Sequence, residues 1–315
     1  MTVPLILDTD IDTDCDDAGA LAVLHALADA GECRPLGVVC SVPVPECVGA
    51  VQAINAWYGR AEIPIGLVAV PGYAQAAPWQ TYRDHRAKCD SNGVLYNERI
   101  GSGHPAQAEE AVALYRRLLA GQADHSVAIC AIGTLTALAQ LLASPADAVS
   151  PLSGVELIRA KVRELSVMAL ASYPTGADRF NWHMDRAAAA QVIRDWPTLL
   201  TVSETGQTIP TGARFVAAAP LGQPVREAYT TFLGGAGRDR PSWDLITVLY
   251  AVLGLAGPFA RSGEHALAFD ATSGAHRWLP PVAGQAPRTC VRPLPSDAAM
   301  ATLLEDLMLA SLRGR

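Results

Sequence analysis

Residues 5–21 read LILDTDIDTDCDDAGAL, an apolar run that passes into six carboxylates and then into small apolar residues. The apolar run predicts a buried β-strand, and the small residues after Asp17 predict a helix. The carboxylates therefore lie where a strand ends and a helix begins, which is where open α/β sheets bind ligands. Six like charges at one point cost free energy unless a cation compensates them. Because these side chains offer only oxygen, they predict a site for Ca²⁺ or Mg²⁺ rather than zinc.

Helix capping explains only part of this acidic cluster. Asp14 or Asp16 can cap the following helix, and acidic side chains in a first helical turn are favoured by the macrodipole. Capping accounts for one or two of the six carboxylates. An EF-hand is excluded, because the turn lacks the central glycine and the late glutamate of that loop and follows a strand.

Apolar runs and helix-like segments alternate along the rest of the chain. The predicted strands lie at 36–40, 63–70, 126–132, 165–170 and 199–202. The predicted helices lie at 18–30, 48–58, 108–119, 135–142, 186–194 and 245–255. This alternation predicts an α/β fold, a mostly parallel, Rossmann-like open sheet with helices on both faces. We expect 1–315 to form a single domain, with one further helix within 203–240 and with short strands and a closing helix after 256.

Residues 71–105 break the alternation and are rich in proline and glycine. The segment also holds Trp79, Tyr82, His85 and Tyr96. A loop of this length within a compact domain is usually functional. The aromatic side chains predict an ordered lid or substrate loop whose rings stack on a ligand.

Composition excludes several classes of protein. The chain has 315 residues, is 50% hydrophobic and carries a net charge of −7, which makes nucleic acid and anionic membranes poor partners. No apolar run reaches the 18 residues of a transmembrane helix, and the N-terminus predicts a strand rather than a signal peptide. Seven cysteines without a CxxC pair predict reduced thiols and a cytoplasmic protein.

Several segments, taken in order, resemble the inosine–uridine-preferring nucleoside hydrolase family. That family opens with an apolar strand, Asp-x-Asp, a turn, Asp-Asp and a small-residue helix. Here the turn is two residues longer, and Asp12 stands where the longer form of the motif usually has glycine. The later segments that resemble the family are GVVC at 37–40, NAWYGR at 55–60, IPIG at 63–66, ICAIGTLT at 129–136, FNWHMDRAA at 180–188 and SWD at 242–244.

The resemblance implies the nucleoside hydrolase fold and Ca²⁺-dependent hydrolysis of the N-glycosidic bond of a ribonucleoside or related N-riboside. Base and ribose are released by a water that binds the metal and that an aspartate activates. The implied metal ligands are Asp10, Asp17, the backbone carbonyl of Ile132 and Asp244, with Ca²⁺ favoured over Mg²⁺. The resemblance also implies a nucleoside-like small molecule as the partner and a homodimer or homotetramer.

The longer turn leaves the general base open among Asp10, Asp12 and Asp14. Counting back from the Asp16-Asp17 pair favours Asp12, whereas counting forward from the strand favours Asp10. We prefer Asp10, because a turn absorbs an insertion more readily than a buried strand changes its register.

On the substrate side, the resemblance implies that Asp16 and Asn181 bind the ribose hydroxyls, with Asp14 beside them. Met168 begins Met-Ala-Leu, where the family has Met-Gly-Gly, and is a further candidate for substrate contact.

Three positions depart from the family or stand beside its motifs. Trp243 replaces a histidine that assists the departing base, and an indole cannot donate a proton as an imidazolium does. Arg179 replaces a glutamate that holds the 5′-hydroxyl, and either faces an anionic group or pairs with a surface acid. His183 is a candidate for protonating the leaving group, the alternative being a structural hydrogen bond.

Two other functions remain open from the sequence. One is a catalytically impaired protein that keeps the metal and binds ribose or a nucleoside. The other is a haloacid-dehalogenase-like phosphatase, which also opens with a strand and Asp-x-Asp, although the residues after Asp10 fit that family poorly.

Overall fold

The computed structural model describes residues 2–88, 95–104, 107–169 and 173–313. Cys89, the parts of 71–105 at 89–94 and 105, and Leu170 at the end of a predicted strand lie outside the described residues. Within the described residues, nine strands form the main sheet, in the order β11-β14-β8-β6-β5-β1-β2-β3-β4. In chain order they are β1 (Val3–Thr9), β2 (Cys33–Cys40), β3 (Ile65–Leu67), β4 (Glu109–Glu110), β5 (Val127–Ala131), β6 (Val162–Met168), β8 (Leu199–Ser203), β11 (Phe259–Arg261) and β14 (Arg288–Pro293).

Parallel pairing dominates this sheet. β1 lies between β5 and β2 and pairs with both in parallel, whereas β11 pairs with β14 in antiparallel orientation. Parallel strands point their carboxyl ends to the same edge of a sheet. The ends of β1, β5 and β6 therefore meet at one edge.

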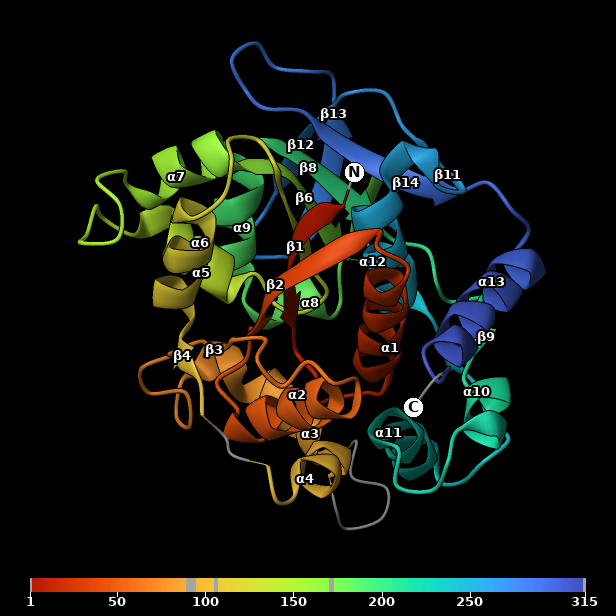
Figure 1. Cartoon of the computed structure of the whole chain (residues 1–315). Helices are drawn as coiled ribbons and strands as arrows, with labels where there is room; N and C mark the ends of the chain where they lie inside the picture. Colours follow the sequence, from red (N-terminus) through yellow and green to blue (C-terminus); the bar gives the residue numbers. More distant parts are fainter. Residues whose placement is uncertain (1, 89–94, 105–106, 170–172, 314–315) are drawn as a thin grey trace.

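Helices cover both faces of the sheet (Figure 1). One face carries α1 (Asp16–Asp29), α2 (Pro45–Trp57), α10 (Ala213–Ala218), α11 (Pro224–Leu233), α12 (Trp243–Leu253) and α13 (Asp297–Ala310). The other carries α5 (Ala111–Ala120), α6 (Thr136–Ala143), α7 (Gly154–Lys161) and α9 (Arg186–Asp195). The structure thus confirms the predicted fold class.

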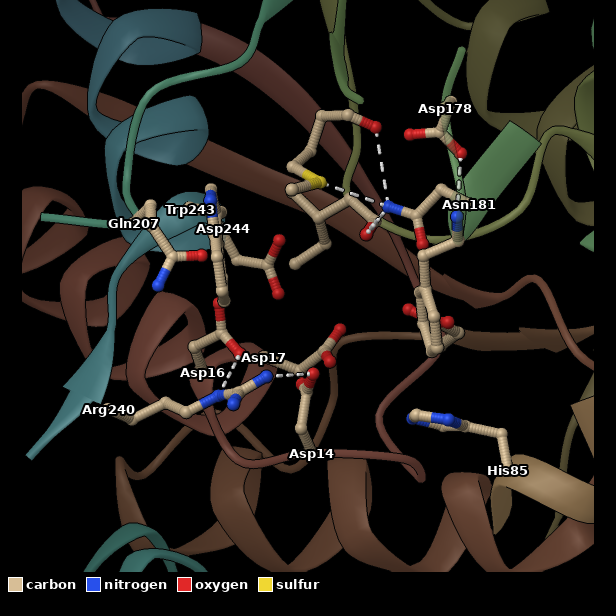
Figure 2. A pocket seen from close by; sticks show the side chains of 14 residues that line it. Asp14, Asp16, Asp17, His85, Asp178, Asn181, Gln207, Arg240, Trp243 and Asp244 are labelled. Atoms are coloured by element: carbon tan, nitrogen blue, oxygen red, sulfur yellow. Dashed lines mark hydrogen bonds and ion pairs between the residues drawn. The ribbon is translucent and has the colours of Figure 1, made fainter. Parts of the chain in front are cut away.

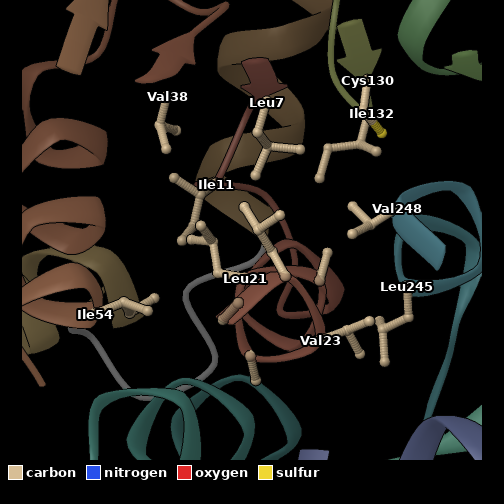
Figure 3. Close-up of a cluster of buried hydrophobic side chains, with 14 of the residues drawn as sticks. Leu7, Ile11, Leu21, Val23, Val38, Ile54, Cys130, Ile132, Leu245 and Val248 are labelled. Carbon is tan, nitrogen blue, oxygen red and sulfur yellow. The ribbon is translucent and has the colours of Figure 1, made fainter. Parts of the chain in front are cut away.

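β1 supplies both layers of the core. Leu5 and Leu7 pack in the cluster on the α1 side, Ile6 packs on the α5 side, and all three are fully buried. Figure 3 shows side chains of this first cluster, among them Leu7 of β1, Val23 of α1 and Leu245 of α12. Because strand side chains alternate between faces, an apolar run buried on both faces fixes β1 in the centre of the sheet.

Short elements fill the regions that the sequence left as loops. The segment 71–105 contains η1 (Ala77–Trp79), α3 (Gln80–Lys88) and α4 (Tyr96–Gly101). One helix was predicted within 203–240, but α10 and α11 both form there. The remaining short elements are β7 (Thr175–Ala177), α8 (Asn181–Met184), β9 (Pro210–Thr211), β10 (Arg240–Pro241), η2 (Gly254–Ala256), β12 (Ala266–Phe269) and β13 (Ala275–Leu279).

Two further findings bear on the sequence predictions. Among the described residues, no helix combines the length and the hydropathy needed to cross a membrane. The six cysteines that the structure describes are free thiols, and five of them are buried.

Candidate functional site

A cavity of about 220 Å³ opens at the carboxyl edge of the sheet (Figure 2). β1 ends at Thr9 and α1 begins at Asp16, so the acidic turn between them forms the floor of this cavity. Nine of the eleven predicted site residues line it, namely Asp10, Asp14, Asp16, Asp17, Ile132, Met168, Asn181, Trp243 and Asp244. Residues more than 230 positions apart in the chain thus come together around the turn.

Gly133 lets the turn after β5 approach the acidic turn. A Cβ at this position would lie 2.7 Å from the backbone nitrogen of Asp10. Any larger residue would separate the two turns, because real Cβ atoms do not approach other atoms so closely. The glycine therefore brings the carbonyl of Ile132 to the same cavity as Asp10.

Four buried aspartates of the cavity have carboxyl groups that are unfavourable in the charged form. Burial, reinforced by neighbouring carboxylates, raises the pKa of Asp10, Asp16, Asp17 and Asp244 well above the usual value. Oδ2 of Asp10 is buried and has no hydrogen-bond partner among the described atoms. An oxygen-only group with an unpartnered buried oxygen fits a hard cation such as Ca²⁺ or Mg²⁺.

The closest group of potential ligands differs from the predicted set. Oxygens of Asp14, Asp16 and Asp244 lie within 4.8 Å of one another among the described residues. Only Asp244 is shared with the ligands that the resemblance implies. Asp17 accepts a hydrogen bond from the hydroxyl of Thr9, and the Ile132 carbonyl accepts one from Asn181 at 2.8 Å.

Arg240 enters the cavity beside these acids and was not among the predicted residues. Its Nη2 lies 2.6 Å from Oδ2 of Asp14, and its Nε lies 3.5 Å from Oδ1 of Asp16. The guanidinium packs over the rings of Phe232 and Trp243, with its Cζ 5.3 and 5.2 Å from their centroids. Arg240 therefore supplies a fixed positive charge, and the ring of Trp243 supports it.

His85 of α3 lies across the cavity from Arg240 (Figure 2), and Phe180 also lines the cavity. Their rings meet edge to face, with centroids 4.6 Å apart. The sequence analysis named His85 only as part of a predicted aromatic substrate loop, and the structure places its side chain in the cavity lining. Gln207 and Asp178 also line the cavity and carried no sequence signal.

Two predicted residues lie elsewhere. His183 lines a separate cavity, where Nη2 of Arg186 lies 2.9 Å from its Nδ1. Burial and the Arg186 charge lower the pKa of His183. Arg179 is exposed and does not line the acidic cavity. The structure therefore does not bring these two side chains together with the carboxylates.

Asp12 also turns away from the cavity. Its carboxylate is fully buried and accepts hydrogen bonds from Tyr82, Arg86 and Asn97. Of the three aspartates left open as the general base, Asp10 and Asp14 line the cavity and Asp12 does not.

The chain matches the family model of the inosine-uridine preferring nucleoside hydrolases over residues 5–273. It belongs to the nucleoside hydrolase family. The chain is therefore a hydrolase that acts on N-glycosyl compounds. No curated protein is similar enough in sequence to count as a match.

Solved structures share the nucleoside hydrolase fold at low sequence identity. The type III effector protein XopQ, complexed with adenosine diphosphate ribose, superposes with a TM-score of 0.72 at 15% identity, covering 99% of this chain and 94% of that one. The plant nucleoside hydrolase PpNRh1 gives 0.67 at 16% identity, with 98% and 99% covered. A purine-preferring ribonucleoside hydrolase from Gardnerella vaginalis gives 0.67 at 16%, with 98% of each chain covered.

Replacing Arg240 by Gln is expected to make this nucleoside hydrolase more dependent on a bound cation. Without the guanidinium, Asp14 and Asp16 repel each other in a largely buried site, which lowers the free energy of unfolding by about 3 kcal/mol. Melting in EDTA should therefore occur at a lower temperature, and added Ca²⁺ should raise the melting temperature more than in the unchanged protein. Arg238→Gln is the matched control, because Arg238 is exposed and donates to the Leu233 carbonyl. An unchanged response to Ca²⁺ would contradict the role given to Arg240.

Proposed function

We propose that this chain hydrolyses the N-glycosidic bond of a ribonucleoside or related N-riboside in a Ca²⁺-dependent reaction. The observation that carries the proposal is the convergence of six aspartates, Asn181 and an aromatic wall on one cavity. Hydrolysis of such a bond passes through an oxocarbenium-like transition state. Nearby carboxylates stabilise the positive charge that develops on the sugar.

Asp10 is the proposed general base. Its Oδ2 is buried without a hydrogen-bond partner, so it is available to take a proton from an attacking water. Burial and the charges of Asp14 and Asp12 raise its pKa. A carboxylate within reach of the attacking water can take its proton. Asp14 is the alternative, but Arg240 already holds its carboxylate.

Asp10, Asp17, Asp244 and the Ile132 carbonyl are the proposed ligands of Ca²⁺. All four offer oxygen, as Ca²⁺ requires, and Mg²⁺ is the less favoured alternative. A divalent cation bound there would lower the pKa of a coordinated water and orient it toward the sugar.

Asp14, Asp16, Asn181 and Met168 are proposed to face the ribose. Nδ2 of Asn181 lies 2.8 Å from the Ile132 carbonyl, 3.3 Å from the Met168 carbonyl and 3.2 Å from Sδ of Met168. These contacts engage the two hydrogens of the amide nitrogen. Asn181 would therefore offer its Oδ1 as an acceptor to a ribose hydroxyl rather than donate to it.

The leaving group is proposed to lie between Trp243 and the wall formed by His85 and Phe180. His85 is the imidazole that lines this cavity, whereas His183 lies in a separate one. We therefore assign the contact with the leaving group to His85 in place of His183. Arg179 is exposed, so a role at the 5′ side would require it to move on substrate binding.

A metal-dependent protein that binds ribose without turnover is the second candidate. Trp243 favours it, because an indole cannot protonate a departing base. The XopQ structure is a complex with adenosine diphosphate ribose, so a protein of this fold binds a ribosyl ligand.

Release of reducing sugar from a panel of nucleosides and from p-nitrophenyl riboside separates the two candidates. We expect turnover that EDTA abolishes and that Ca²⁺ restores better than Mg²⁺. The activated riboside needs little acid assistance, so it reports on the catalytic centre even when no tested nucleoside is a good substrate. Binding of ribose with no turnover of any riboside would support the binding protein instead.

We also propose that residues 1–315 form a single domain that assembles into a homodimer or homotetramer. The family resemblance supports the assembly. Sedimentation velocity would show a mass of two or four chains, and a monomer over the working concentration range would contradict it.

A further inference from the structure

We propose that Asp12 is a positioning residue that joins the acidic turn to α3 and α4 and thereby places His85 in the cavity. This inference rests on the proposed function, because His85 matters only if a leaving group lies against it. By the resemblance to the family, Asp12 stands where the longer form of the motif usually has glycine.

The carboxylate of Asp12 has three partners on two helices. From α3, the hydroxyl of Tyr82 donates to Oδ2 at 3.0 Å, and Nε of Arg86 lies 2.7 and 2.9 Å from the two oxygens. From α4, Nδ2 of Asn97 donates to Oδ1 at 2.6 Å. Tyr82 and Asn97 are buried, and Arg86 is about a quarter exposed. Charge-assisted hydrogen bonds in a buried place hold their geometry tightly.

α3 is a short helix whose described side chains are mostly exposed or half-buried. It has nine residues, and Tyr82 is the one buried side chain among those described in it. A helix of this length is marginal in water without tertiary contacts. The contacts of Tyr82 and Arg86 with Asp12 attach α3 to the acidic turn, beside the ring contact of His85 with Phe180.

The same helix carries His85 to the cavity. Successive helical residues leave the axis about 100° apart, so Arg86 and His85 project from adjacent faces of α3. While Arg86 is held by Asp12, His85 meets Phe180 at 4.6 Å across the cavity from Arg240 (Figure 2). A shift of α3 would move the imidazole away from the leaving group, and a misplacement of about 1 Å can lower a rate 100-fold.

Two different arginines compensate the carboxylates of the acidic turn. Arg86 lies 2.7 Å from Asp12, whereas its next carboxylates, Glu46 and Glu98, lie at 3.6 and 3.8 Å. Arg240 serves Asp14 and Asp16 on the other side of the turn. The turn thus uses Asp12 to hold α3 and α4, and leaves the acids that line the cavity to the reaction.

The test compares Asp12→Asn with Asp84→Asn, the same change on the exposed Asp84 of α3. Each variant is assayed on its best nucleoside and on p-nitrophenyl riboside, whose leaving group needs little help. We expect Asp12→Asn to lower kcat/KM about 100-fold for the nucleoside and less than about threefold for the activated riboside. Asp84→Asn should change neither. Equal losses on both substrates would overturn the proposal, because a merely structural defect does not distinguish leaving groups.

A double-mutant cycle with His85→Ala shows whether Asp12 acts through His85. In the His85→Ala background, Asp12→Asn should have no further effect on the ratio of the two substrates, whereas additive losses would overturn the proposal. Arg86→Gln removes the same ion pair from the α3 side. If Asp12→Asn does not fold, Arg86→Gln should give the same change in the ratio of the two substrates.

Failure of the proposed function would be visible separately. If the unchanged protein hydrolyses no riboside, the proposed function fails. Hydrogen exchange then tests the attachment of α3. Backbone amides of residues 80–88 should exchange faster in Asp12→Asn than in Asp84→Asn, and equal exchange would overturn the attachment itself.

Discussion

Replacing Asp10 by Asn is expected to lower kcat for riboside hydrolysis about a thousandfold, within the range that a general base contributes. Asparagine keeps the shape of the side chain but cannot take a proton from water. The unpartnered Oδ2 of Asp10 makes no hydrogen bond whose loss would unfold the protein. Removing one of several crowded carboxylates should instead leave the melting temperature in EDTA unchanged or raise it. Turnover of p-nitrophenyl riboside at saturating substrate is the measurement.

Asp14→Asn is the matched comparison for this prediction. Asp14 is the other cavity-lining aspartate that the longer turn leaves as a possible base, and Arg240 holds it at 2.6 Å. Because the guanidinium of Arg240 occupies Oδ2 of Asp14, that oxygen is less accessible to an attacking water, and we expect Asp14→Asn to lower kcat less than about tenfold. A larger loss in Asp14→Asn than in Asp10→Asn would move the base to Asp14 and would contradict the assignment by counting from the strand.

The sequence was sufficient to predict the floor of the site. Asp10, Asp16 and Asp17 lie within one turn, and the apolar run before them allows only a buried strand. These three residues are therefore close in space because they are close in the chain. Ile132 and Asp244 could be added because they follow recognisable segments at the ends of β5 and at the start of α12.

The walls of the site could not be predicted in the same way. Arg240 contacts Asp14, which lies 226 residues away in the chain, and no sequence pattern near either residue predicts this ion pair. His85 was recognised only as part of an aromatic loop, because its place depends on α3 and on the contact of Asp12 with Arg86 across 74 residues. Such contacts are set by tertiary packing rather than by local patterns.

Neighbourhood in the chain was misleading for His183 and Arg179. Both flank Asn181, which does line the cavity. Asn181 is the first residue of the short helix α8, so the side chain of His183, two residues later, points in another direction. Arg179 precedes the helix. His183 thus lies against Arg186, and Arg179 faces solvent. α7 was also missed, although the capping box of Ser153 and Glu156 marks its start.

Asp17→Asn and Asp244→Asn are each expected to weaken Ca²⁺ binding at least about 100-fold, because each removes a charged oxygen ligand from a site of few ligands. Isothermal titration with Ca²⁺ is the measurement. Asp244 belongs both to the ligand set implied by the family and to the close group with Asp14 and Asp16. Its loss should therefore weaken binding whichever set holds the ion.

Asp17 and Asp14 separate the two possible ligand sets. Arg240 already offsets the charges of Asp14 and Asp16, at 2.6 and 3.5 Å. Asp17 accepts a hydrogen bond from the hydroxyl of Thr9 and forms no ion pair with the described residues, and burial raises its pKa together with the charges of Asp10 and Asp14. A cation gains more by approaching an uncompensated carboxylate than one held by a guanidinium. We therefore expect Asp14→Asn to weaken Ca²⁺ binding less than about tenfold. If Asp14→Asn weakened Ca²⁺ binding more than Asp17→Asn, the ion would lie among Asp14, Asp16 and Asp244. Arg240 would then have to move when the ion binds.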